Sequence, residues 1–279
     1  NNKIYAAAVT PVVTNAVGLT LNGDTYTSGT PIATCGKHTL VITGVGGYTQ
    51  TIGFTVLPTV INVTDGGVYA VAVNPVINNA VGLALNGEAH TSGTQISRVG
   101  NHEILITGVG GYTRSVSFTV TESSNIAADA KYMDSVAVNV PNAVDLKVDG
   151  ETVANGTLVD LIGEHTLTVI GIGSYERKYE FTVTPTLTVS EGQVFGKPVK
   201  ILLIKATMLL DGEEINADTD VSKHGRHTLV IKGTGDYTET ITFKYSNPNL
   251  SLTLFISIPV AIAAAAAAAI VFLKRRRVL

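Results

Sequence analysis

The sequence predicts an all-β chain of four tandem small β-sandwich repeats followed by one transmembrane α-helix. Three observations lead to this fold class. Residues 15–56 recur without a gap as residues 79–120, with more than half of the positions identical. Within these blocks apolar and polar residues alternate, and glycine-rich turns separate the alternating runs. Near the C-terminus, a long uncharged stretch ends in a cluster of basic residues.

The repeat has the period of a whole small domain, because two kinds of residue mark the same register four times. The marker tyrosines are separated by 64, 63 and 62 residues, and the marker histidines keep the same spacings. These residues are Tyr48, Tyr112, Tyr175 and Tyr237, with His38, His102, His165 and His227. We therefore predict repeats at residues 1–60, 61–123, 124–186 and 187–247, of which the fourth is the most divergent.

Each repeat is predicted to consist of short antiparallel strands in two layers. In the run HTLVIT, His38, Leu40 and Ile42 face one side of a strand and the intervening residues face the other. Four dipeptides supply the positive φ angles of tight hairpin turns: Asn22-Gly23, Asn86-Gly87, Asp149-Gly150 and Asp211-Gly212. A sandwich is the simplest architecture for such strands.

The C-terminal segment predicts a membrane anchor. From Leu250 to Leu273 the chain carries no charge, and about 24 helical residues at 1.5 Å each span about 36 Å, enough to cross a bilayer. We assign residues 248–273 to a transmembrane helix and residues 274–279 to a basic tail. The positive-inside rule places the tail in the cytoplasm and the repeats outside the cell, in a single-pass protein of the cell membrane.

A resemblance follows from the repeated motifs. The string G-x-x-Y, A-x-x-LNG, SGT-x-I, G-x-H-x-L-x-I-T-G-x-x-GYT and FTV, which covers nearly all of residues 5–245, resembles the immunoglobulin-like tandem repeats of Gram-positive-type bacterial cell-surface proteins. The resemblance implies an immunoglobulin-like fold. It also implies a role as spacer, adhesion module or ligand-binding unit.

The residues that could carry chemistry favour structural roles. No second metal ligand or carboxylate lies at a constant short spacing from the four marker histidines. We therefore predict that these histidines pack in the fold or form hydrogen bonds to a turn. The tyrosine of each GYT motif is predicted to pack at a sandwich corner. The loop TGVGGYT joins strand to strand and lacks the end of a phosphate-binding loop. The turns NGD, NGE and DGE offer too few carboxylates for a calcium loop.

Two further residue types have weak functional signals. Cys35 is the only cysteine, which excludes an intrachain disulfide, and it aligns with Val99, Ile162 and His224 in a mainly apolar slot. The sequons at Asn62, Asn155 and Asn249 matter only in a eukaryotic secretory pathway. We therefore predict that the chain is not an enzyme and name no catalytic, cofactor-binding or metal residue, and no cofactor. The net charge of -3 argues against nucleic acid as a partner.

The function predicted from these features is that of a non-enzymatic, membrane-anchored cell-surface protein whose repeats act as a stalk or adhesive rod. Two alternatives stay open. The repeats form a module that binds an extracellular carbohydrate or protein through turns such as residues 24–31, where Tyr26 stands opposite His90. Alternatively, they are the accessory region of a larger ectoenzyme whose catalytic part lies before Asn1.

Overall fold

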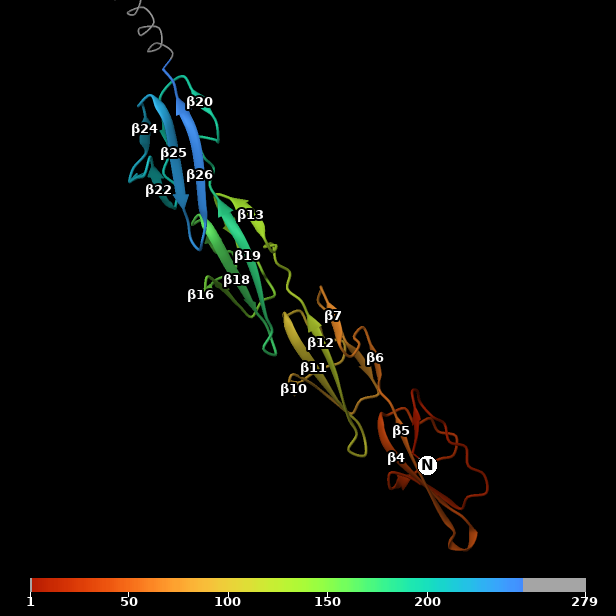
Figure 1. Ribbon diagram of the computed structural model, residues 1–279. Coiled ribbons are helices and arrows are strands. Elements are labelled where there is room, and N and C mark those ends of the chain that lie inside the picture. Colours follow the sequence, from red (N-terminus) through yellow and green to blue (C-terminus); the bar gives the residue numbers. More distant parts are fainter. Residues whose placement is uncertain (1, 248–279) are drawn as a thin grey trace, which may run out of the picture. The chain divides into compact units, whose positions relative to one another are not determined.

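The computed structural model describes residues 2–247, and these residues form β-strands joined by turns and loops (Figure 1). The one short helix in this range is a 3-10 turn, Val45–Gly47. The prediction of an all-β chain is therefore confirmed. Within residues 2–247, no helix is long and apolar enough to cross a membrane. The predicted transmembrane helix at residues 248–273 and the basic tail at 274–279 lie outside the described residues.

The main sheet of the first repeat has five strands in the order β1-β5-β4-β2-β3. Its strands are β1 (Lys3–Tyr5), β2 (Gly18–Leu21), β3 (Asp24–Thr25), β4 (Gly36–Thr43) and β5 (Thr49–Val56). The long hairpin β4–β5 forms the centre of the sheet, and the two shorter strands β1 and β3 form its edges.

The same strand order recurs in the following three repeats. The second repeat contains β7 (Gly67–Tyr69), β9 (Gly82–Leu85), β10 (Glu88–Ala89), β11 (Gly100–Thr107) and β12 (Thr113–Val120). The third contains β13 (Ala130–Met133), β15 (Asp145–Val148), β16 (Glu151–Val153), β18 (Gly163–Ile170) and β19 (Glu176–Thr184). The fourth contains β20 (Val194–Phe195), β22 (Thr207–Leu210), β23 (Glu213–Glu214), β25 (Gly225–Lys232) and β26 (Thr238–Tyr245). The tandem-repeat prediction is confirmed at the level of the strand order.

A second, smaller layer covers the main sheet. It consists of two-stranded pairs: β6 (Thr59–Ile61) with β8 (Val76–Asn78), β14 (Val136–Ala137) with β17 (Leu158–Val159), and β21 (Val199–Ile201) with β24 (Thr219–Val221). At the place of β14–β17, the first two repeats have single bridges, between Val9 and Ile32 and between Val73 and Ile96. Ile32 packs with Leu40 and Phe54 of the main sheet, so the core lies between the layers, as in a sandwich.

The strands are not all antiparallel, and this part of the prediction is wrong. The first strand of the main sheet pairs in parallel with the last, as in Lys3↔Phe54 and Tyr5↔Val56. The same parallel pairing joins β7 to β12, β13 to β19 and β20 to β26. Alternation of side chains reports which face is buried but not the direction of the neighbouring strand, so the sequence pattern could not reveal this pairing.

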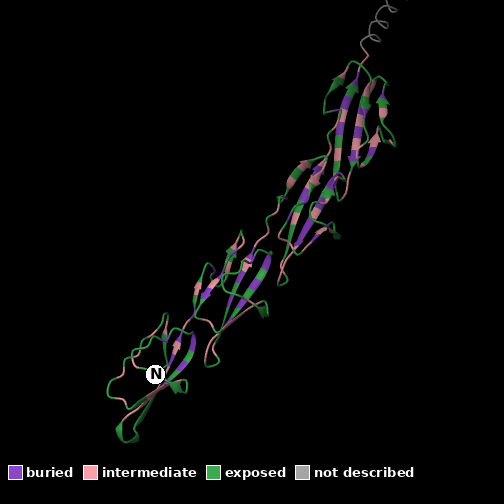
Figure 2. Cartoon of the chain, turned by 180° about the vertical axis from the view of Figure 1, so that it is seen from behind, coloured by how far each residue is buried: buried purple, intermediate pink, exposed green. Residues whose placement is uncertain are grey.

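The predicted hairpin turns are confirmed. Asn22 has a φ of 53° and Gly23 a φ of 96°, and the equivalent pairs in the other repeats also have two consecutive positive φ values. Two positive φ values in succession match the type I′ turn that joins tightly paired strands. Figure 2 shows buried and exposed positions alternating along the long strands. In β4 this alternation buries His38 and Leu40, as the period-two pattern predicts.

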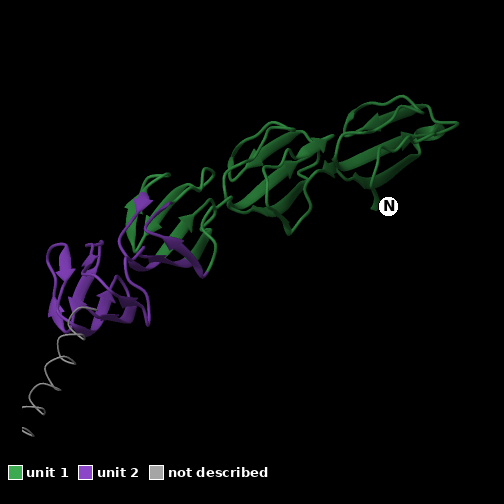
Figure 3. Ribbon diagram, turned by 90° about the horizontal axis from the view of Figure 1, so that it is seen from above, with its two compact units in different colours: residues 1–128, 138–157, 166–179 green, residues 129–137, 158–165, 180–279 purple. Residues whose placement is uncertain are grey.

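By compactness the chain divides into two units, coloured separately in Figure 3. The first consists of residues 1–128, 138–157 and 166–179, and the second of residues 129–137, 158–165 and 180–279. Residues of the third repeat contribute to both units. The repeat bounds predicted at residues 60, 123 and 186 stay a prediction.

Candidate functional site

The marker histidines are buried inside the repeats, and hydrogen bonds occupy their ring nitrogens. His38 is 3% exposed, and its Nε2 lies 2.8 Å from the carbonyl oxygen of Thr34. Its Nδ1 lies 3.2 Å from Nδ2 of Asn22. Because a carbonyl oxygen only accepts, Nε2 carries the proton and Nδ1 accepts from the Asn22 amide. His102 makes the same two contacts, at 2.9 and 3.1 Å.

The histidine of the fourth repeat differs in one partner. Nε2 of His227 lies 2.7 Å from the carbonyl oxygen of Lys223, and Nδ1 lies 2.7 Å from Oδ2 of Asp211. A carboxylate oxygen only accepts, so Nδ1 of His227 donates to Asp211, whereas Nδ1 of His38 accepts. Burial raises the pKa of Asp211, but hydrogen bonds from the Thr228 amide and from His227 outweigh burial and leave the pKa lowered.

Each of these rings also lies against a phenylalanine of the next strand. The ring centroids are 5.2 Å apart for His38 and Phe54, and the other three pairs are 5.4 to 5.6 Å apart. These contacts, together with the hydrogen bonds, account for the four histidines as packing and turn-bonding residues. Within residues 2–247, no three His, Cys, Asp or Glu side chains gather in a group able to hold a metal ion.

The tyrosines of the GYT motifs do not share one environment. Tyr112 packs against the core of the second repeat, and the hydroxyl of Tyr175 donates to Glu122. The hydroxyl of Tyr237 donates to Oε2 of Glu239 at 2.6 Å. Tyr48, in contrast, is 63% exposed, so the predicted packing position is wrong for the first repeat.

Cys35 lies at a junction between two repeats. Its side chain is fully buried and belongs to the apolar core of the second repeat, together with Val73 and Ile104. Val99, in the same slot of the second repeat, is also fully buried, and Ile162 in the third is 3% exposed. The apolar slot predicted from the alignment is therefore confirmed, but it faces the next repeat, which the sequence did not show.

The first junction is made by backbone hydrogen bonds. The amide of Val109 donates to the carbonyl oxygen of Cys35 at 2.9 Å, and the amide of Lys37 donates to the carbonyl oxygen of Val109 at 3.0 Å. A third bond, of 2.7 Å, runs from the amide of Cys35 to the carbonyl oxygen of Asn79. We call residues 35–37 the edge segment of the first repeat, and residues 108–112 the docking loop of the second.

The next two junctions repeat this arrangement. Edge segment 99–101 meets docking loop 171–175, with bonds of 2.8 and 2.9 Å between Ile172 and the edge segment. Edge segment 162–164 meets docking loop 233–237, with bonds of 2.8 and 3.0 Å between Thr234 and the edge segment. In both, the amide of the apolar edge residue donates to a carbonyl oxygen of the next repeat, that of Asn142 or Lys205. The three junctions therefore use one common set of backbone bonds.

Glycine in the docking loop permits this close approach. A Cβ added to Gly108 would lie 2.4 Å from the carbonyl oxygen of Cys35. At the equivalent positions the distances are 2.5 Å for Gly171 and 2.2 Å for Gly233, again to edge carbonyl oxygens. Any side chain at these positions would force the two backbones apart.

The second junction adds a buried polar cluster. The side chain of Glu122, in the linker after β12, is 1% exposed and accepts hydrogen bonds from the hydroxyls of Tyr175 and Tyr179. Nη1 of Arg177 lies 3.1 Å from the same carboxylate. Burial raises the pKa of Glu122, but the two tyrosine hydroxyls and Arg177 outweigh burial and leave it lowered. Burial and the hydrogen bond to Glu122 raise the pKa of Tyr179 to about 12.

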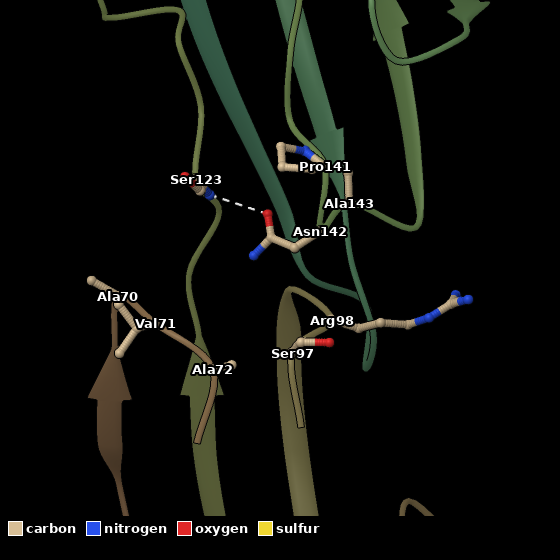
Figure 4. A pocket seen from close by; sticks show the side chains of 9 residues that line it. All are labelled: Ala70, Val71, Ala72, Ser97, Arg98, Ser123, Pro141, Asn142 and Ala143. Carbon is tan, nitrogen blue, oxygen red and sulfur yellow. Dashed lines mark hydrogen bonds between the residues drawn. The ribbon is translucent and has the colours of Figure 1, made fainter. Parts of the chain in front are cut away.

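A pocket of about 520 Å³ lies beside the second junction (Figure 4). Its lining consists mostly of small side chains: Ala70, Val71, Ala72, Ser97, Arg98, Ser123, Pro141, Asn142 and Ala143. The amide of Ser123 donates to Oδ1 of Asn142 at 3.1 Å, as the dashed line shows. No aromatic ring lines the pocket, so it lacks the aromatic side chains that are typical of small-molecule sites.

Tyr26, the aromatic residue in the turn proposed for ligand binding, is not exposed. Tyr26 is 8% exposed, and its hydroxyl donates to the carbonyl oxygen of Thr30 at 2.5 Å. Its counterpart His90 has a pKa lowered by burial. Among the sequons, Oδ1 of Asn155 accepts from the Val140 amide at 2.5 Å, Nδ2 of Asn62 donates to the carbonyl oxygen of Asn74 at 3.0 Å, and Asn249 lies outside the described residues.

Together the fold and the junctions define an all-β chain of tandem sandwich repeats that are joined through their backbones. No family model and no curated protein sequence matches this chain. Among solved structures it is similar to a Bacteroides ovatus glucan-utilization protein, SGBP-B, in complex with a mixed-linkage heptasaccharide, at 12% identity and a TM-score of 0.20. That match covers 87% of this chain and 92% of the other.

Two further similarities are to animal proteins built from immunoglobulin domains or acting in immunity. The eight N-terminal immunoglobulin domains of the Down syndrome cell adhesion molecule match at 10% identity and a TM-score of 0.18, over 88% of this chain. This chain spans 53% of the length of that fragment. The insect immune protein hemolin matches at 8% identity and a TM-score of 0.18, over 88% of this chain and 98% of the other. At such TM-scores these similarities carry no argument about ligand or origin.

Proposed function

We propose that this chain is a non-enzymatic cell-surface protein whose repeats act as a stalk or adhesive rod anchored in the membrane. The single observation that carries the proposal is the repeated junction. A string of independent domains needs only linkers, whereas here each of three successive junctions has the same three inter-repeat backbone bonds. At about 1 kcal/mol net for each bond, a junction gains a few kcal/mol against free rotation of its two repeats.

The interior of the repeats supports a mechanical rather than a catalytic role. The histidines at the marker position are 3 to 4% exposed, and in the first, second and fourth repeats both ring nitrogens contact partners inside the repeat. The buried carboxylate of Glu122 orders a linker. Each of these polar groups therefore holds parts of the chain together.

The proposed anchor is the uncharged segment of residues 248–273, with Lys274 and the following arginines on the cytoplasmic side. In this orientation the repeats lie outside the cell. The proposed origin is a Gram-positive-type bacterial surface, on the basis of the repeated sequence motif. The membrane-distal end of the stalk would then act in adhesion.

Surface display tests the proposal directly. The chain is expressed behind a signal peptide with an epitope tag before Asn1, and intact cells are examined by flow cytometry before and after treatment with an external protease. We expect the tag on the surface, its loss with protease, and a small C-terminal fragment left in the membrane. The matched control ends at residue 247 and should release the tag into the medium. A tag that stays protected inside intact cells would contradict the proposed orientation.

A further inference from the structure

The first repeat carries a docking loop of its own. Residues 43–49 have the sequence TGVGGYT, which is identical to residues 107–113 around the docking loop of the second repeat. In the second repeat Val109 and Tyr112 are half-buried, because Val109 pairs with an edge segment and Tyr112 packs against the core that includes Cys35. In the first repeat Val45 is 83% exposed and Tyr48 is 63% exposed. Within residues 2–247, no backbone hydrogen bond is made by Val45 to another repeat.

Neither the backbone conformation of Gly44, at the start of this loop, nor its surroundings within the first repeat require a glycine. Gly44 has a φ of -104°, a conformation open to any residue. A Cβ added to Gly44 would meet, as its nearest atom, only Cδ1 of Tyr48 at 3.4 Å. The same addition at Gly108 would meet the carbonyl oxygen of Cys35 at 2.4 Å. A glycine at position 44 is therefore explained by a docked edge segment, as at the other three loops.

The three filled junctions define what that edge segment looks like. Each begins with a buried apolar residue followed by glycine, and the marker histidine comes two residues after the glycine: Cys35-Gly36, Val99-Gly100 and Ile162-Gly163. The fourth repeat has an exposed His224 in the apolar position. A Cβ added to Gly225 would meet no described atom within 4 Å. The end of the fourth repeat thus lacks the apolar residue, which disfavours a second copy of this chain as the occupant.

We infer that residues 44–48 are a docking surface for one further repeat of the same kind, joined in tandem and carrying an apolar residue before its edge glycine. In the docked state the amide of Val45 donates to the carbonyl oxygen of that apolar residue. The carbonyl oxygen of Val45 accepts from the amide two residues further on, as that of Val109 accepts from Lys37. This inference stands whether or not the chain is anchored in a membrane.

The test extends the full chain at its N-terminus by a second copy of residues 1–64. The copy keeps the register, since Lys3 and Gly67 hold equivalent places opposite Phe54 and Phe118. Hydrogen exchange of the Val45 amide is then measured by mass spectrometry in the original and the extended chain. We expect exchange at residues 44–46 to slow at least about tenfold in the extended chain, because a solvent-exposed amide becomes hydrogen-bonded.

A matched substitution separates docking from a general effect of the extension. Gly44→Ala, made in the extended chain outside the added copy, should return exchange at Val45 to the original rate. The same substitution in the original chain should leave thermal unfolding unchanged. Unprotected exchange at Val45 in the extended chain would overturn the inference. Protection that already exists in the original chain and rises with protein concentration would also overturn it, because a second copy would then occupy the surface.

Discussion

The amide of Val109 donates a hydrogen bond of 2.9 Å to the carbonyl oxygen of Cys35, although these two residues belong to different repeats. This bond brings the only cysteine of the chain into a junction, with its side chain in the core of the second repeat. Burial raises the pKa of the Cys35 thiol, so the thiolate is scarce while the junction is closed. The reactivity of Cys35 therefore reports the opening of the first junction.

Substitution of Gly108 should open this junction. In Gly108→Ala the new Cβ would lie 2.4 Å from the carbonyl oxygen of Cys35, and relief of such overpacking costs about 1–3 kcal/mol. We expect alkylation of Cys35 in the native chain to become about tenfold faster, which corresponds to about 1.4 kcal/mol. Gly44→Ala is the matched control and should leave the rate unchanged. Equal rates in the two variants would show that the close approach does not hold the junction together.

Much of the repeat fold could be predicted from the sequence, because the signals are local. Asn22-Gly23 predicts two positive φ values, and the alternation around His38 predicts a half-buried strand; both are confirmed. The parallel pairing of β1 with β5 could not be predicted, because it joins residues about 50 positions apart and side-chain alternation is the same for either direction. The direction of a strand is a property of the pairing and not of its own residues.

The sequence does not predict the junctions, for a related reason. The alignment of Cys35 with Val99 and Ile162 predicts an apolar slot, but a slot inside a repeat and a slot between repeats have the same composition. Two features relate to the junction: the change to His224 in the last repeat, and the glycine at position 108, whose φ is not one of the positive values that favour glycine. Glu122 is a single charged residue in a linker, and nothing in its sequence neighbourhood indicates partners more than 50 residues away.

The marker histidines should differ in the hydrogen-bonding role of Nδ1. In His38 and His102 one ring nitrogen faces a carbonyl oxygen and the other an amide, whereas in His227 both face acceptors. We expect long-range proton–nitrogen NMR spectra to show Nδ1 without a proton in His38 and Nδ1 with a proton in His227. Asp211→Asn should convert His227 to the pattern of His38. Identical spectra for all four rings in the unaltered chain would contradict this assignment.

The same substitution should change the pH dependence of the fourth repeat. The pKa of Asp211 is lowered in the folded chain, so the ionised carboxylate stabilises the fold. This stabilisation is present above the unfolded pKa of about 3.9 and is lost as the pH falls through the folded pKa. The Asp211 side chain is 47% exposed, so we expect a loss of only about 0.5–1 kcal/mol. Local hydrogen exchange at Thr228, followed with pH in both chains, measures it. An unchanged pH profile in Asp211→Asn would contradict the expectation.

Acid should loosen the second junction through Glu122. Its lowered pKa means that the stabilisation is present above the unfolded value of about 4.3 and is lost as the pH falls through the folded pKa. Glu122→Gln should remove this pH dependence and cost about 1–3 kcal/mol at neutral pH, because hydrogen bonds to a charged group are lost. Hydrogen exchange of residues 121–125 between pH 3 and 7 measures both effects. Tyr179→Phe keeps the carboxylate and should cost less.

The apolar slot at the edge should accept valine and reject histidine. Cys35→Val places the residue of the second repeat into the first, a change close in volume that should cost less than about 1.5 kcal/mol. Cys35→His places the residue of the fourth repeat there, and its ring nitrogens would enter the apolar core that surrounds Cys35. An unsatisfied buried polar group costs about 1–3 kcal/mol, so the junction should open.

Exchange of the Val109 amide is the measurement for both variants, since its partner is the backbone carbonyl oxygen of residue 35 and not the thiol. Cys35→Val should keep the amide protected, and Cys35→His should speed its exchange about tenfold or more. His224→Val is the control at the other end, where the side chain is exposed, and should leave exchange in residues 100–120 unchanged. Equal protection of the Val109 amide in Cys35→His and Cys35→Val would contradict the prediction. The apolar residue would then not explain why the first three edge segments are docked.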